Sequence, residues 1–159
     1  MAAPTAIACQ NGFKLEVSDD ASSWVDISGE GVAITLDGGE QLIGEQMTAE
    51  NAFALLCDSG KTSPIGITCR TVYSEDSGGG FDEVWTRYTG SDKTLAVRFS
   101  PRGGLAGHKR YTTSVDAAGA DVVPIVSCLP PALDAETAGL ALFEFSVRTP
   151  ALFQESIPT

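Results

Sequence analysis

The strongest constraint on this chain is a repeated alternation of apolar and polar side chains. Phe13, Leu15 and Val17 alternate with Lys14 and Glu16. The same period recurs in four later segments, which are residues 32–36, 65–73, 95–99 and 143–148. Successive side chains of a strand point to opposite faces of a sheet, so each segment predicts a strand with one buried face.

Three further apolar segments, residues 24–27, 111–115 and 122–129, bring the prediction to about eight short strands. The last of them is apolar on both faces, which predicts a central or covered strand. Glycine-rich turns separate many of these segments. We therefore expect a mainly β fold, namely a β-sandwich or barrel of about eight strands.

One segment follows a helical spacing instead. Its four apolar residues recur at i, i+3, i+4 and i+7, and they are Phe81, Val84, Trp85 and Tyr88. Acidic residues open the segment, where the helix dipole favours negative charge, and Gly90 follows it as a C-terminal cap. We expect one short flanking helix over about residues 81–89, with these four side chains packed against the core.

Residues 37–64 show only weak patterning. A structureless excursion of this length is long for a compact domain, and such loops are usually functional or disordered. Two interpretations remain open: an arm that reaches away from the body, or two ordinary strands joined as a hairpin. Within it, residues 48–56 fit a short helix and residues 52–57 fit a strand.

Charge is unevenly distributed along the chain, which has a formal net charge of −11. Residues 1–60 hold ten acids and one base, whereas residues 61–110 hold eight bases and five acids. An acidic surface repels nucleic-acid backbones. Opposed charge zones can attract a second copy head to tail. The basic residues Arg102, Lys109 and Arg110 are candidates to meet a neighbour's carboxylates.

The residues needed for catalysis or metal binding are sparse. The only histidine is His108, and the four cysteines at positions 9, 57, 69 and 128 form no metal-ligand spacing. Cys69 and Cys128 lie in apolar runs and are predicted to be core residues. The apolar start has no basic residue before it, which argues against a secretory signal and favours synthesis in the cytoplasm. No uncharged run reaches the roughly 20 residues of a membrane span. We expect no enzyme activity, no cofactor and no metal.

An ordered set of segments resembles the tail tube (major tail) proteins of long-tailed bacteriophages. It covers roughly residues 60–150. It comprises Gly60–Thr68 opening a strand, the aromatic helix Phe81–Tyr88, the turn Ser100–Gly104, the segment Gly107–Tyr111, and the closing strand Ala141–Val147 with Thr149–Pro150. These are patterns of strands and turns rather than catalytic residues.

The resemblance implies a structural virion protein of the phage tail, assembled in the host cytoplasm. Six subunits would close into a ring, and the rings would stack into a tube that holds the tape measure protein, meets tail tip and terminator proteins, and later passes DNA. One domain, residues 1–159, would carry an N-terminal arm (1–10), a stacking loop (about 37–64) and a C-terminal arm (about 150–159). The stacking residues would be Gln41, Leu42, Ile43, Gly44, Glu45, Gln46 and Met47, with Arg102, Lys109 and Arg110. The alternatives are a capsid decoration or virion surface protein, and a β-sandwich module that binds carbohydrate or peptide.

Overall fold

The computed structural model describes residues 12–46, 55–116, 118–131, 133 and 139–159. In chain order the elements are β1 (Lys14–Ser18), β2 (Val25–Asp26), β3 (Gly31–Gly38), β4 (Gln41–Gln46), β5 (Leu55–Thr62), β6 (Ile65–Val72), α1 (Gly80–Thr89), β7 (Thr94–Ser100), β8 (Lys109–Ser114), β9 (Val123–Leu129), β10 (Leu142–Thr149) and β11 (Ala151–Ser156). The mainly β prediction, with one short helix, is confirmed.

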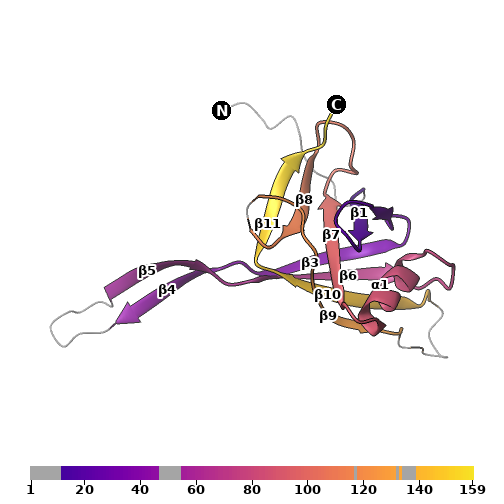
Figure 1. Ribbon diagram of the computed structural model, residues 1–159, viewed down its shortest axis with the longest axis horizontal. Coiled ribbons are helices and arrows are strands. Elements are labelled where there is room, and N and C mark those ends of the chain that lie inside the picture. Colours follow the sequence, from indigo (N-terminus) through magenta and orange to yellow (C-terminus); the bar gives the residue numbers. More distant parts are fainter. Residues whose placement is uncertain (1–11, 47–54, 117, 132, 134–138) are drawn as a thin grey trace.

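The sheet folds over on itself in two antiparallel parts. One part has the strand order β2-β1-β7-β8-β11, and the other has the order β9-β10-β6-β3. They join where Thr94 and Leu95 of β7 pair with Pro124 and Val123 of β9. In Figure 1 the β7, β8 and β11 ribbons run steeply, whereas β3, β6 and β10 run across the view. The two parts therefore cross at a large angle, as in an orthogonal sandwich.

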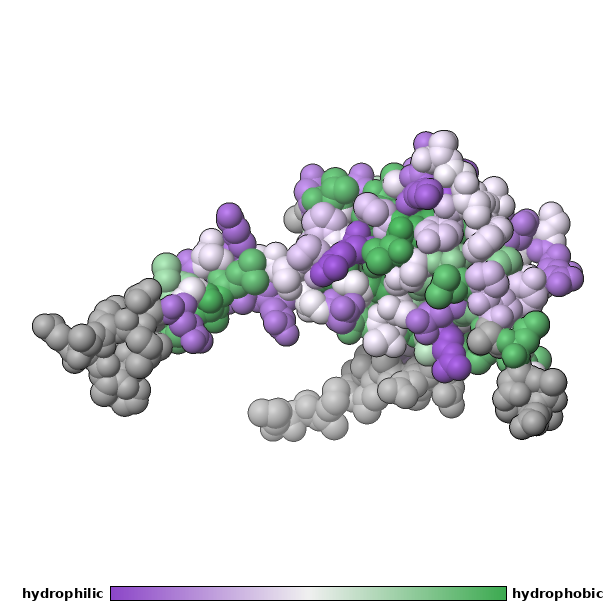
Figure 2. Space-filling model, turned by 90° about the horizontal axis from the view of Figure 1, so that it is seen from below, coloured by the Kyte–Doolittle hydropathy of each residue, from purple (hydrophilic) through white to green (hydrophobic). Residues whose placement is uncertain are grey.

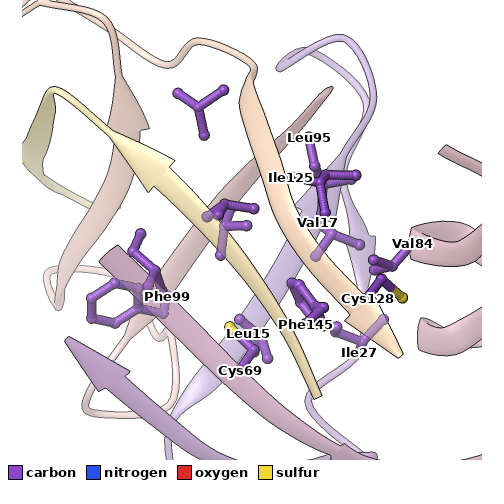
Figure 3. Packing of buried hydrophobic residues seen from close by; sticks show 14 of the residues in the cluster. Leu15, Val17, Ile27, Cys69, Val84, Leu95, Phe99, Ile125, Cys128 and Phe145 are labelled. Atoms are coloured by element: carbon purple, nitrogen blue, oxygen red, sulfur yellow. The ribbon is translucent and has the colours of Figure 1, made fainter. Parts of the chain in front are cut away.

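The core lies between these two parts of the sheet. β1 contributes Leu15 and Val17, and β10 contributes Phe143, Phe145 and Val147, all of them almost fully buried. Figure 3 shows Leu15, Val17 and Phe145 pointing into the same interior as residues of β7 and β9. The alternation in the sequence thus marked the inward face correctly in both halves of the sandwich.

The helix α1 covers one side of the core and begins one residue before the predicted start. Val84 is fully buried, and Phe81, Trp85 and Tyr88 pack against the core while staying partly exposed. Gly79, at the N-cap, supplies no side-chain cap. A carboxylate from another element substitutes for it, because Glu30 accepts a hydrogen bond from the Gly80 N–H at 2.9 Å.

The described part of the chain has eleven strands rather than about eight. Two of the additional strands, β4 and β5, form a separate two-stranded sheet within the segment 37–64. The third, β11, occupies residues that were expected to be a C-terminal arm, and it pairs with β8 over six residue pairs. Its alternation was hidden because Leu152 and Phe153 are neighbours, which places an apolar residue on each face.

β9 lies between β7 and β10, so its predicted central position is confirmed where Val123 and Pro124 pair with β7. The rest of that edge is unpaired among the described strands. The outward residues of β9 are not covered. Val126 is 55% exposed and Leu129 is 66% exposed. Pro124 lies at the end of the strand, and the register shifts opposite Ser146 and Val147 of β10.

Candidate assembly surfaces

The β4–β5 hairpin is the most distinctive surface of the protein. It leaves the end of β3 and β6 and extends along the longest axis, away from the sandwich (Figure 1). Residues 41–45 and 56–62 are exposed. Leu42, Ile43 and Leu56 are 47%, 53% and 67% exposed, respectively. The hairpin therefore presents aliphatic side chains that contribute little to the core.

The base of the hairpin is set by two interruptions that lie opposite each other, one between β3 and β4 and one between β5 and β6. Gly38 and Gly39 adopt φ values of 77° and 73°, in the left-handed region that favours glycine. On the opposite strand, Ser63 and Pro64 separate β5 from β6. Ser63 closes the base, because its N–H donates to Glu40 O at 2.8 Å and its Oγ accepts the Glu40 N–H at 3.0 Å. These contacts fix where the hairpin leaves the sheet.

A second surface is the outward face of the β9-β10-β6-β3 part of the sheet. Its central row runs across all four strands as Ser127, Ser146, Thr68 and Thr35. The Ser127 and Ser146 hydroxyls lie 2.7 Å apart and share a hydrogen bond. Because the β10 phenylalanines point inward, this uncharged, hydrogen-bonding row points outward.

Charged residues flank that row in equal numbers of each sign. Glu144 of β10 lies directly opposite Arg70 of β6. Further along, Gly66 of β6 lies between Arg148 of β10 and Asp37 of β3. The Asp37 carboxylate lies over Gly66, where a Cβ would collide with it. The ion pairs of the described residues involve none of these four charged side chains. Apart from Val126 and Leu129, the exposed aliphatic residues of β9, this face is therefore polar and charge-balanced, unlike the acidic chain as a whole.

The predicted stacking residues fall in two separate places. Residues 41–46 form β4, whereas Met47 lies outside the described residues. Arg102, Lys109 and Arg110 lie at the far end of the other part of the sheet, beside β11. There Lys109 Nζ donates to Ser156 Oγ at 2.8 Å, and Arg110 Nε donates to Glu155 Oε1 at 2.9 Å. Two of the three basic side chains are thus bound within their own chain, and Arg102 is exposed.

Three of the four predicted helix residues, Phe81, Trp85 and Tyr88, form an aromatic cluster with Phe143. The Phe81 ring meets Phe143 edge-on at 5.1 Å between centroids and stacks on Trp85 at 5.5 Å. Trp85 in turn contacts Tyr88 at 6.2 Å. The fourth predicted helix residue, Val84, enters the core fully. The cluster seals the side of the sandwich against which α1 packs.

A polar cluster that was not predicted from the sequence lies on the outward side of β1 and β7. Arg98 Nε and Nη2 donate to the two Glu16 carboxylate oxygens at 2.6 and 2.9 Å, and Lys14 adds a third contact at 3.0 Å. The Arg98 guanidinium lies over the Trp24 ring, with its Cζ atom 4.1 Å from the ring centroid. Alternation placed Glu16 and Arg98 on polar faces, but no signal in the sequence revealed the register that pairs them.

The histidine and the two core cysteines, which are the residue types most often used in catalysis and metal binding, make contacts typical of structural residues. His108 Nδ1 accepts the Leu105 N–H at 3.2 Å within its own turn. Burial raises the pKa of Cys69 to about 12 and that of Cys128 to about 11, which keeps both thiols protonated and unreactive. Among the described residues, no group of three His, Cys, Asp or Glu side chains could hold a metal ion. None of the described helices is long and apolar enough to cross a membrane.

The sequence matches no family model and no curated protein. Solved structures share its fold. A chain from the sheath/tube terminator of the extracellular contractile injection system PVC, in the extended state, aligns with a TM-score of 0.68 at 15% identity, over 98% of this chain and 100% of that one. A chain of the sheath–tube complex of the same system gives a TM-score of 0.67 at 13% identity, over 96% and 94%.

A chain from the tail of an empty GTA particle, computed by helical refinement with C6 symmetry, gives a TM-score of 0.60 at 14% identity, over 93% of this chain and 100% of that one. Sequence identities this low establish the fold alone. The tail-tube resemblance is thus confirmed as a likeness of fold. The protein has the fold of chains found in contractile injection systems and particle tails.

Proposed function

We propose that the protein is a tail tube subunit whose copies form six-membered rings that stack into a hollow tube. The observation that carries this proposal is the β4–β5 hairpin. It projects from the sandwich with Leu42, Ile43 and Leu56 in solvent. Exposed aliphatic side chains do not stabilise an isolated subunit, but they do stabilise an interface in which a neighbour buries them. The shared fold with chains of tail and tube complexes, one of them with C6 symmetry, supports the same conclusion.

Open strand edges provide a route to ring closure. Among the described strands, β3 pairs only with β6, and β9 pairs with β7 over just two residues. An unpaired edge exposes backbone N–H and C=O groups that can template another strand. If β3 of one copy extends the sheet toward β9 of the next, the contact is heterologous and closes by rotation.

The outward face of β9-β10-β6-β3 would then line the bore. Its serine and threonine row offers hydroxyl groups, and its two arginines are matched by Asp37 and Glu144. A wall with no net charge does not bind DNA phosphates tightly. The net charge of −11 on each chain adds long-range repulsion between the protein and the DNA. We propose DNA as the material that passes through the tube.

The remaining partners follow from this role. The tube would enclose a tape measure protein during assembly and meet tip and terminator proteins at its ends. The subunit would be made in the host cytoplasm and would end in the tail of the particle. It would act by packing against copies of itself and would catalyse no reaction.

Negative-stain electron microscopy of the purified protein over a range of concentrations tests the proposal. The wild type should form rings or tubes. Ile43→Asp places a charge on the hairpin and should abolish them, whereas Val115→Asp, at a similarly exposed aliphatic residue of the body (55% against 53%), should not. Equal thermal unfolding would show that both variants fold. A wild type that stays monomeric at every concentration contradicts the proposal.

A further inference from the structure

A second exposed aliphatic group lies at the end of the sandwich. Its members are Val126, Leu129, Leu133 and Leu140, and we call them the end patch. Leu133 and Leu140, in the connection between β9 and β10, are 83% and 75% exposed. Figure 2 shows apolar atoms at the end of the molecule opposite the hairpin. Clustered exposed aliphatic residues of this kind mark interaction sites in proteins.

The hairpin carries the matching group. Ile43 and Leu56 are diagonal neighbours on one face of the hairpin, because Ile43 pairs with Asp58 and Leu56 pairs with Glu45. The hairpin extends from one end of the long axis, whereas β9 ends and β10 begins toward the other end (Figure 1), so the two groups cannot meet within one chain.

We infer, building on the proposed tube, that the end patch receives the β4–β5 hairpin of a second copy. The other large exposed aliphatic residues of the described chain offer no equal match. Leu105 and Val115 stand on separate loops, and Val32 and Leu36 lie apart on β3, with Val32 near the start of the strand and Leu36 near the base of the hairpin. The hairpin and the end patch are the two aliphatic groups of this size, and every copy brings one of each.

The two groups differ from each other and lie toward opposite ends of the long axis, so the contact is heterologous. Each copy bound through its hairpin still offers a vacant end patch, and the contact repeats without limit. A repeating contact of this kind is what growth of a tube needs. The end patch is therefore the acceptor for the arm, and burial of both aliphatic groups supplies the driving force.

Disulfide cross-linking tests the contact directly. In a Cys9→Ser, Cys57→Ser background, Leu56→Cys is combined with Leu140→Cys, and the assembled protein is oxidised and run on a non-reducing gel. The matched control combines Leu56→Cys with Leu105→Cys, because Leu105 is similarly exposed at 69%. We expect a ladder of dimers and higher multimers for the first pair and monomers for the control.

The protein concentration at which tubes begin to form gives a second readout that needs no introduced cysteines. Leu140→Asp should raise the protein concentration needed for tube formation at least tenfold, whereas Leu105→Asp should leave it within twofold of wild type. Tubes that form without a ladder from the Leu56→Cys/Leu140→Cys pair, with equal thresholds for both aspartate variants, would overturn the inference and leave the tube standing. A wild type that never assembles would overturn both.

Discussion

The Glu16–Arg98 pair allows a sharp test of how the β1–β7 contact is held together. The Glu16 and Arg98 side chains are only 8% and 16% exposed, and the guanidinium contacts both carboxylate oxygens. Removal of one partner leaves the other charge buried and unmatched. For such pairs the loss is about 3–5 kcal/mol, whereas replacement of both partners by apolar residues is often nearly neutral.

We expect the lower end of that range for each single variant. After Arg98→Met, Glu16 still has Lys14 at 3.0 Å, and after Glu16→Leu, Arg98 still has the Trp24 ring. Each change should therefore lower the free energy of unfolding by about 3 kcal/mol. The double variant Glu16→Leu/Arg98→Met should lie within about 1 kcal/mol of wild type, because the two apolar side chains face each other across β1 and β7.

Urea unfolding at pH 7, followed by tryptophan fluorescence, measures these values. The pH dependence supplies a further check. Burial alone raises the pKa of Glu16, but hydrogen bonds from Arg98 and Lys14 outweigh it and hold this pKa below its ordinary value of 4.5. The stabilisation is therefore complete above pH 4.5 and is lost as the pH falls through the lowered pKa. Single-variant losses that simply add in the double variant would refute this account of the cluster.

Three other changes test the hairpin base, the core and the helix. Gly38→Ala should lower the free energy of unfolding more than Gly60→Ala does. Both glycines have positive φ, which costs an alanine about 1–2 kcal/mol. Only at Gly38 would the new Cβ also collide with the Pro64 carbonyl oxygen. Phe145→Ala should cost about 3–5 kcal/mol in urea unfolding because the ring is fully buried. Trp85→Ala should cost less, about 2 kcal/mol, because the indole is partly exposed and packs chiefly on Phe81 and Tyr88; a loss as large as that of Phe145→Ala would contradict this placement of the helix.

The parts of the fold with one buried face were predictable from the sequence. β10 alternates because one side of the strand packs into the core and the other meets solvent. β1 alternates because its other side carries Glu16, which contacts Arg98 and Lys14 outside the apolar core. The stripe of Phe81, Val84, Trp85 and Tyr88 located the helix to within a residue for the same reason. Burial on one side imposes a period that can be read from a single sequence.

The assembly surfaces were harder to predict because they lack that asymmetry. Both strands of the hairpin are exposed over residues 41–45 and 56–62, so no buried face imposes a period on them. The Glu16–Arg98 pair joins residues 82 positions apart, and strand register across that separation follows from the folded sheet rather than from local pattern. The end patch was obscured because Val126 and Leu129 resemble core residues in a run that is apolar on both faces.

Electron cryomicroscopy of the assembled protein, or of the particle that carries it, tests the central claim most directly. We expect a hollow tube of stacked six-subunit rings, with the β9-β10-β6-β3 face toward the bore and the β4–β5 hairpin of each copy bound to another copy. Single subunits at every concentration, or an assembly in which Ser146 and Glu144 face outward and the hairpin touches no neighbour, would contradict it.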